Sequence, residues 1–305
     1  MLTWTIGSGG LIGSAINARS AQPFAGPSIT WSEPKQAQRE LLQGLDHFTA
    51  AVAGDPWSIV WAAGAGTTAS PPEIFEPEID TFSFFVEQLR LRAPSGPGIF
   101  GLISSAGAIH AGSVQLPFTA ETHPAPISAY GRAKLKQEQL LAHILEGEVP
   151  CIVFRVSNAY GPGQNLDKLQ GLVSRLAVCT YRHEPVLLFV PVTTVRDYIF
   201  TSDIAVRVHL WLAKPTTTMK GMQTVVIASG TGTSIAQLVR IAGDISHRRI
   251  PIAMGSHPSS KDQPADSRFV PTPLPTRQMP AATSMPIGVR TVFDDISSRL
   301  AQASA

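Results

Sequence analysis

Short apolar runs alternate with segments of helical periodicity through the first half of the chain. Such runs are typical of buried strands, and the segments between them are typical of helices that cover a parallel sheet. The predicted strands are Leu2–Ile6, Ser28–Trp31, Ser58–Ala62, Gly98–Ser104 and Cys151–Val156. The predicted helices are Leu11–Arg19, Lys35–Ala53, Glu73–Arg92 and Ala129–Glu146. We therefore expect an α/β fold built on a doubly wound parallel sheet.

The second half of the chain is less regular. Its pattern predicts helices over Leu169–Thr180 and Ser234–Gly243, and extended segments over Val186–Val190, Thr194–Phe200 and Thr224–Ala228. Seven prolines between His257 and Pro286 favour ordered loops around a ligand, with a disordered linker as the alternative. We expect residues 1–160 with 194–215 to form the sheet domain. Residues 161–193 and 216–305 would form a smaller α/β C-terminal lobe that binds the substrate.

The first strand runs directly into a glycine turn that opens an apolar helix. Gly7 suits the tight turn, Gly10 lets a pyrophosphate approach the backbone, and Gly13 lets helix and strand pack closely. The helix N-terminus then offers N–H groups and a positive dipole end to phosphates. A glycine triplet alone can be a flexible turn, but its position between strand and helix predicts a Rossmann-type site for a dinucleotide.

Four segments fall just past predicted strand ends. They are Gly7, Ala63 with Gly64, Ser104 with Ser105, and Asn158. The carboxyl ends of parallel strands meet at one edge of a sheet, where ligands bind in such folds. We therefore expect these segments to converge on one site.

Tyr130 and Lys134 lie four positions apart in a predicted helix, so they share one of its faces. A free phenol titrates near 10, and an adjacent ammonium favours the phenolate and lowers that pKa. The pair is a candidate proton acceptor for an alcohol. The alternative is an exposed helix with a solvated lysine.

Composition narrows the class of protein. Hydrophobic residues make up 44% of the 305 residues, which is ample for a core, and the net charge of +2 gives no electrostatic reason to expect a nucleic-acid or membrane partner. Cys151, Cys179 and the eight histidines show no metal-ligand spacing, so we expect reduced structural thiols and no metal. Without a secretory pattern or an apolar stretch near ~18 residues, a cytoplasmic location is expected.

Together these segments resemble the extended short-chain dehydrogenase/reductase family, in its sugar-nucleotide epimerase/dehydratase branch. The resemblance runs nearly end to end. It is carried by Gly7–Gly13, Ala62–Gly64, Ile103–Gly107, Glu121–Lys134, Phe154–Gln164 and Val195–Ala205.

The resemblance implies a role for each matching residue. Ser105 would bond the substrate oxygen, Tyr130 would be the base, and Lys134 would hold the nicotinamide ribose and lower the Tyr130 pKa. NAD or NADP would lie on Gly7, Gly10, Leu11, Ile12, Gly13, Ser32, Ala62, Ala63, Gly64, Tyr130 and Lys134. The sugar or sugar nucleotide would contact Ser105, His110, Asn158, Arg196 and Arg268. The alternatives are a bystander for His110, turn capping for Asn158 and an ion pair with Asp197 for Arg196. The resemblance also implies a homodimer built from the helices over Glu73–Arg92 and Ala129–Glu146.

Three departures from the family pattern leave questions open. After the predicted strand Ser28–Trp31, Glu33 is suited to a ribose hydroxyl and Lys35 to a 2′-phosphate, so the choice between NAD and NADP stays open. The short stretch before Ser58 indicates that a strand–helix unit on the adenine side is missing. Gln263 stands where the family carries an arginine for a diphosphate, and Arg268 is the candidate replacement.

The sequence thus favours three functions in order. Ala106 and Gly107 occupy the positions of the acidic pair of the dehydratases, so dehydration is disfavoured. The leading hypothesis is an NAD(P)-dependent sugar-nucleotide epimerase or oxidoreductase. The second is an NADPH-dependent keto-sugar reductase. A sensor or scaffold that binds a dinucleotide without catalysis is the third, and the intact Ser105, Tyr130 and Lys134 argue against it.

Overall fold

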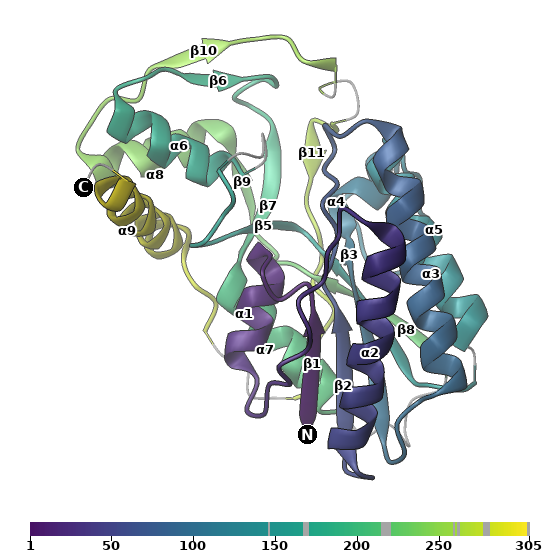
Figure 1. Ribbon diagram of the computed structural model, residues 1–305. Helices are drawn as coiled ribbons and strands as arrows, with labels where there is room; N and C mark the ends of the chain where they lie inside the picture. Colours follow the sequence, from purple (N-terminus) through teal and green to yellow (C-terminus); the bar gives the residue numbers. More distant parts are fainter. Residues whose placement is uncertain are drawn as a thin grey trace.

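Five parallel strands form the central sheet of the molecule, in the order β1-β2-β3-β4-β8 (Figure 1). The computed structural model describes residues 1–145, 147–166, 171–214, 221–258, 260, 263–276 and 281–303. The sheet strands are β1 (Leu2–Ile6), β2 (Trp57–Trp61), β3 (Gly98–Ser105), β4 (Cys151–Val156) and β8 (Met222–Ile227). Every pairing in this sheet is parallel, as the alternation of strands and helices predicts.

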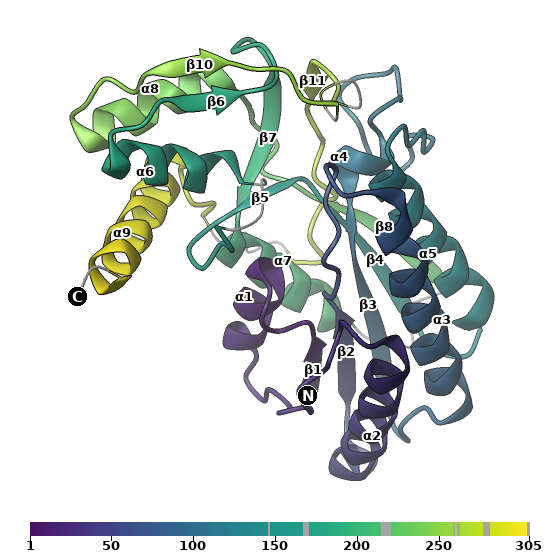
Figure 2. The same cartoon turned by 45° about the horizontal axis from the view of Figure 1, so that its top comes forward.

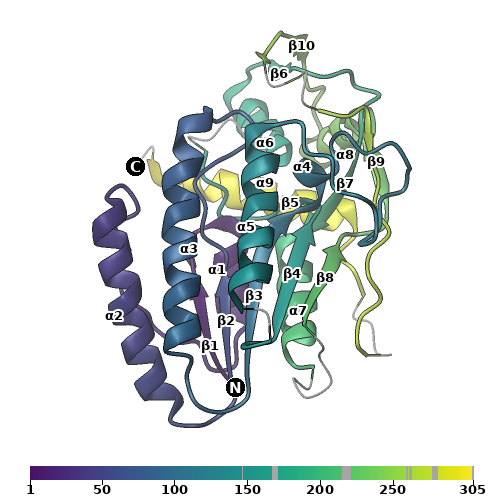
Figure 3. The same cartoon turned by 90° about the vertical axis from the view of Figure 1, so that its right-hand side faces the viewer.

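Helices cover both faces of the sheet, which confirms the doubly wound Rossmann-type fold. One face carries α1 (Leu11–Arg19) and α7 (Thr201–Leu212). The other carries α2 (Pro34–Val52), α3 (Phe75–Leu91) after the 3-10 turn η1 (Pro72–Ile74), and α5 (Ala129–Leu145), as Figure 3 shows. Large side chains of these helices, Phe48, Phe82, Phe85 and Leu141, are fully enclosed against the sheet. Burial of such side chains is the main stabilising term of this layer.

The predicted strand Ser28–Trp31 is wrong, because the segment has no strand beside it. Its Thr30 instead gives its backbone N–H and its hydroxyl to the Glu40 carboxylate, at 2.6 and 3.0 Å. The strand β1 is consequently the edge of the sheet, and the strand–helix unit expected to be missing is absent from the described residues. The outer side of β1 is covered by residues 22–24, where Thr3 bonds Gln22 O and Phe24 N at 2.9 and 2.8 Å.

The second lobe lies above the carboxyl edge of the sheet (Figure 2). Its first sheet joins β5 (Asn158–Tyr160), β7 (Val195–Phe200), β9 (Gly232–Ser234) and β11 (Asp266–Ser267). Its second pairs β6 (Val186–Leu188) with β10 (Ile252–Met254). The helices α6 (Leu172–Arg182), α8 (Ile235–Ser246) and α9 (Met285–Ala303) enclose a separate core with them.

The expected domain boundaries need correction in two places. Residues 222–227 form β8 of the central sheet, although the sequence places them in the lobe. Residues 195–200 form β7 of the lobe sheet, although the sequence places them with the first domain. The chain therefore crosses between the two parts more often than its pattern indicates.

Two further features bear on the class of protein. Cys151 and Cys179 are both free and buried. Within the described residues, no helix is both long and apolar enough for a bilayer crossing, and no cluster of three metal-ligating side chains occurs.

Candidate active site

A cleft of about 580 Å³ opens at the carboxyl edge of the central sheet and extends under the second lobe. Its volume lies within the ~300–1,000 Å³ of small-molecule sites. The segments after β1, β2, β3 and β4 all line it, through Gly10, Gly64, Ser105 and Asn158. The convergence expected from the strand ends is therefore present.

The glycine turn forms one end of the cleft. Gly7 has φ +87°, and a Cβ there would lie 2.6 Å from Ala63 N. A Cβ at Gly13 would overlap the Gly7 carbonyl oxygen. At Gly10 a Cβ would meet only Gly7 O, at 3.4 Å, and Gly10 lines the cleft with Leu11 and Ile12. Gly7 and Gly13 thus shape the turn, while Gly10 leaves its backbone open to a ligand.

The N-terminus of α1 fits a phosphate. No side chain caps this helix at Gly10, so its first N–H groups remain available in the cleft. Ala62, Ala63 and Gly64 border the same space from β2. These residues fit the pyrophosphate of a dinucleotide.

Ser105, Tyr130 and Lys134 all line the cleft. Ser105 ends β3 and begins the short helix α4 (Ala106–Ile109), whose Ala108 N–H it accepts at 3.4 Å. Its hydroxyl also hydrogen-bonds the Tyr130 phenol. Tyr130 packs against Phe75, with ring centroids 6.1 Å apart. Lys134, one turn later on α5, is buried and donates to Ile103 O at 3.4 Å and to Gln137 Oε1 at 3.1 Å.

The pKa of Tyr130 differs from the sequence expectation. Burial raises it to about 12, Ser105 opposes the rise through its hydrogen bond, and the Glu78 carboxylate adds to it. Lys134 is not among these causes, so the expected lowering is absent; its ammonium donates to Ile103 and Gln137. In the free protein Tyr130 is thus a neutral phenol at physiological pH.

Glu78, on α3, is a polar residue of this site that the sequence reasoning missed. Its Oε1 accepts the backbone N–H groups of Ala65 and Gly66, at 2.8 and 3.0 Å. Burial lowers the pKa of Lys134, and the charges of Glu78 and Glu138 raise it. An acidic residue in the first turn of a helix is common, so only the fold reveals that it faces Lys134.

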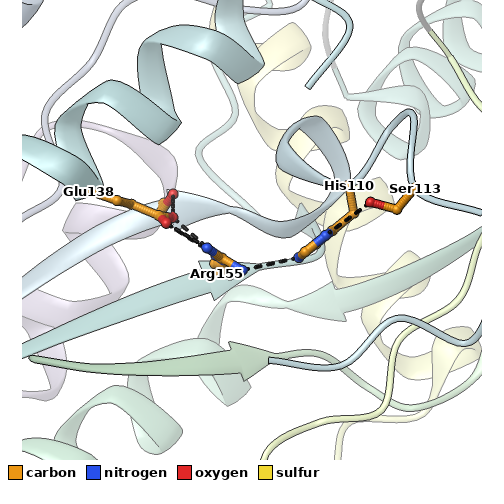
Figure 4. Close-up of polar contacts among 5 residues, drawn as sticks. His110, Ser113, Glu138 and Arg155 are labelled. Carbon is orange, nitrogen blue, oxygen red and sulfur yellow. Dashed lines mark hydrogen bonds and ion pairs between the residues drawn. The ribbon is translucent and has the colours of Figure 1, made fainter. Parts of the chain in front are cut away.

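His110 belongs to a buried polar network with Arg155 and Glu138 (Figure 4). Arg155 Nη1 lies 3.3 Å from His110 Nε2, and Arg155 forms an ion pair of 2.7 Å with Glu138. Burial and the Arg155 charge lower the pKa of His110 to about 4. His110 has no exposed surface and is not among the described residues that line the cleft. The structure therefore separates it from the expected sugar contact and favours the bystander alternative.

At the other end, Arg196 and Asn158 line the cleft. Asn158 donates to Asp197 O at 3.1 Å. Arg196 donates to Val195 O and Pro264 O, at 2.9 and 2.7 Å, and lies 3.5 Å from Gln263 Oε1. Asp197 instead accepts from Ser157, Ser229 and Gly230, so the alternative ion pair with Arg196 does not form.

Two predicted contacts lie outside the cleft. Arg268 pairs with Asp266 at 2.9 Å, its side chain is half exposed, and it is not among the described lining residues. Ser32 is exposed beside the start of α2 and does not line the cleft either. The cleft also has walls that the sequence reasoning did not identify. They include Thr68, Gln164, Arg175, Phe189 and Tyr198.

Comparison with known proteins gives partial sequence matches. Residues 90–228 match the model of the NAD dependent epimerase/dehydratase family. A dTDP-L-rhamnose 4-epimerase of Burkholderia thailandensis is 32% identical over 133 residues, which is 43% of this chain and 36% of that protein. A dTDP-4-dehydro-6-deoxyglucose reductase of Escherichia coli is 32% identical over 104 residues, 33% of this chain and 32% of that protein. The chain thus spans about a third of the length of these curated relatives.

Solved structures match over nearly the whole chain. A UDP-glucose 4-epimerase of Thermotoga maritima, with UDP-glucose, has a TM-score of 0.79 at 19% identity and covers 98% of this chain and 100% of its own. An NAD dependent NDP-hexosamine 5,6-dehydratase has a TM-score of 0.76 at 16% identity, over 98% of this chain and 97% of its own. At sequence identities of 16% and 19%, the structural similarity establishes the fold of this chain.

Proposed function

We propose that this chain belongs to the NAD dependent epimerase/dehydratase family, whose model matches residues 90–228, and is an NAD(P)-dependent enzyme that acts on a hydroxyl or keto group of a sugar nucleotide or related sugar. The observation that carries the proposal is the meeting of Ser105, Tyr130 and Lys134 between an open glycine turn and the buried Arg196. NAD is favoured by the family and by neighbours solved with NAD, and NADP is the other outcome of the test below.

Each residue has a defined task in this proposal. Gly10 and the N-terminus of α1 hold the pyrophosphate, and Lys134 bonds the ribose. Ser105 donates to the reacting sugar oxygen, and Tyr130 takes or gives the proton of that oxygen. A dinucleotide held there would supply the hydride chemistry of the reaction. The hydrogen bond of Ser105, which acts on the pKa of the Tyr130 phenol, supports a shared role for the two hydroxyls.

The sugar end of the cleft suits a nucleoside diphosphate. Arg196 and Arg175 both line the cleft, and the guanidinium of Arg196 donates to the carbonyl oxygens of Val195 and Pro264. A preorganised guanidinium matches a phosphate well. The named relatives include a dTDP-sugar epimerase and a dTDP-sugar reductase, and a structural neighbour was solved with UDP-glucose. We propose a substrate of this class.

Epimerisation is the leading reaction, and net reduction of a keto-sugar is the second candidate. Reduction is favoured by one observation, the raised pKa of Tyr130, because a neutral phenol is the proton donor that a ketone needs. Dehydration is disfavoured because Ala106 and Gly107 follow Ser105 and carry no acid. We further propose a cytoplasmic homodimer.

The test begins with the dinucleotide retained by the purified protein, identified by mass spectrometry. Tightly held NAD indicates an epimerase, exchangeable NADPH indicates a reductase, and no binding to any dinucleotide refutes the proposal. The protein is then incubated with dTDP- and UDP-linked sugars and their 4-keto forms. Tyr130→Phe should lower turnover by about 10² to 10⁴, while Tyr181→Phe, on the exposed side of α6, should not. Equal turnover by Tyr130→Phe would contradict the proposed role.

A further inference from the structure

Trp31 exposes its ring in a chain whose other tryptophans are buried. It is 44% exposed, whereas Trp4, Trp57, Trp61 and Trp211 are between 2% and 6% exposed. A tryptophan ring contributes most to stability when its large apolar area is removed from water. The exposed indole of Trp31 is therefore a flat apolar surface that a ligand can cover.

The segment between α1 and α2 brings this indole along β1 to the carboxyl edge of the central sheet (Figure 1). Near the start of β1, the Phe24 N–H donates to the Thr3 carbonyl at 2.8 Å. Seven residues later, Trp31 contacts Trp61, with ring centroids 6.1 Å apart and ring planes at 84°. Trp61 is the last residue of β2, and Ala62, which follows it, lines the cleft. Trp31 thus lies just beyond the described lining residues, at the β1 end of the cleft.

A tight turn fixes the backbone that carries the indole. The Glu33 N–H donates to the Thr30 carbonyl at 3.0 Å, so Trp31 is the second residue of a four-residue turn. Glu40, on α2, accepts the Thr30 N–H and hydroxyl at 2.6 and 3.0 Å, and Gln36 donates to the same carboxylate at 2.8 Å. A surface that is already ordered loses little entropy when a ligand covers it.

The order of the strands indicates which half of a dinucleotide reaches this turn. Ser105, which lines the cleft with Tyr130, ends β3, while Gly10 follows β1, the edge strand. A pyrophosphate at Gly10 with the nicotinamide directed to Tyr130 leaves the second nucleoside on the outer side of β1. On that side the described chain has no further strand of the central sheet, and it places the turn of Trp31 there.

We propose that the indole of Trp31 is the stacking surface for the adenine of the dinucleotide. This inference rests on the proposed function, because it assigns one part of the same cofactor site. A base stacks on an aromatic ring through its π face, so a single indole can hold the adenine where a strand–helix unit is missing. Stacking does not involve the ribose hydroxyls, so Trp31 should contribute equally to the binding of NAD and of NADP.

The test is a calorimetric titration of the purified protein with ADP, NAD and NADP. Trp31→Leu keeps an apolar contact with Trp61 and removes the flat ring. The affinity for all three probes should fall by about 5- to 100-fold, which is the effect of losing one base–aromatic stack. Trp31→Tyr retains a ring and should lose less. Tyr181→Leu removes another exposed aromatic side chain, on α6, and is the matched control that should leave all three affinities unchanged.

Fluorescence gives a second readout that needs no variant. Because the other four tryptophans are buried, acrylamide quenches mainly Trp31, and saturation with ADP should protect this emission. Equal ADP affinity of wild type and Trp31→Leu overturns the inference, and so does unchanged acrylamide quenching if that variant does not fold. In both cases the proposed function stands as long as the wild type binds NAD or NADP. Absence of wild-type binding to all three probes overturns both.

Discussion

The ion pair between Glu138 and Arg155 joins α5, which carries Tyr130 and Lys134, to β4 of the central sheet. The side chains are 4% and 7% exposed, and Arg155 Nη2 lies 2.7 Å from Glu138 Oε2. Glu138→Leu leaves the guanidinium without its counter-ion inside the protein. Breaking a buried pair in this way costs about 3–5 kcal/mol. We therefore expect a large loss of stability from this single substitution.

The expected change in Tm for Glu138→Leu can be calculated from the length of the chain. An unfolding entropy of roughly 2.1 cal/mol/K per residue gives about 0.64 kcal/mol/K for 305 residues. The expected fall in Tm is about 5–8 °C, measured by differential scanning calorimetry. The exposed pair Arg92–Asp46 is the control, because its side chains are 48% and 57% exposed. Asp46→Asn should lower Tm by less than about 2 °C.

A second variant tests the cause of the loss. Glu138→Leu combined with Arg155→Met removes both charges and should recover much of the Tm, because apolar replacements of buried pairs are often neutral. Recovery should be incomplete, since Ser104 and His110 each lose a partner. A Glu138→Leu protein that melts within about 2 °C of wild type, or a double variant below the single one, would refute the reasoning.

Two other predictions concern the cofactor and the assembly. Gly10→Val should leave the protein folded, because a Cβ there meets only Gly7 O, yet abolish NAD(H) and NADPH binding in a calorimetric titration by filling the cleft. Unchanged affinity would remove the cofactor assignment. Light scattering at micromolar concentration should give the mass of a dimer formed through α3 and α5, where Phe84 and Leu135 stay partly exposed. A monomer mass would count against that interface.

Local chemistry explains why part of the site was predictable. Gly7, Gly10 and Gly13 act through backbone geometry over a few residues, and Tyr130 and Lys134 share a face by helical spacing, so sequence spacing alone identified these residues. The strands β1, β2, β3 and β4 were predicted within one residue at each end because each is a separate apolar run.

Contacts between distant segments explain what sequence reasoning missed. Glu78 meets Lys134 across 56 positions of the chain, and His110 meets Arg155 across 45. In each pair, the sequence around one residue does not indicate that the other lies beside it. The segment Ser28–Trp31 has the composition of a strand, but a strand exists only where another strand pairs with it.

The covered edge of β1 has a consequence for the behaviour of the protein at high concentration. An edge strand with free N–H and C=O groups is a template for pairing with other chains. Here the Thr3 N–H donates to the Gln22 carbonyl, and the Thr3 carbonyl accepts the Phe24 N–H. Pro23 lies between them without an N–H, so the short bridge cannot extend into a further strand. Phe24 anchors the cover against Trp4 and Phe48, with ring centroids 5.8 and 5.1 Å away. A Rossmann sheet shortened on its adenine side thereby carries its own protection against edge-to-edge aggregation.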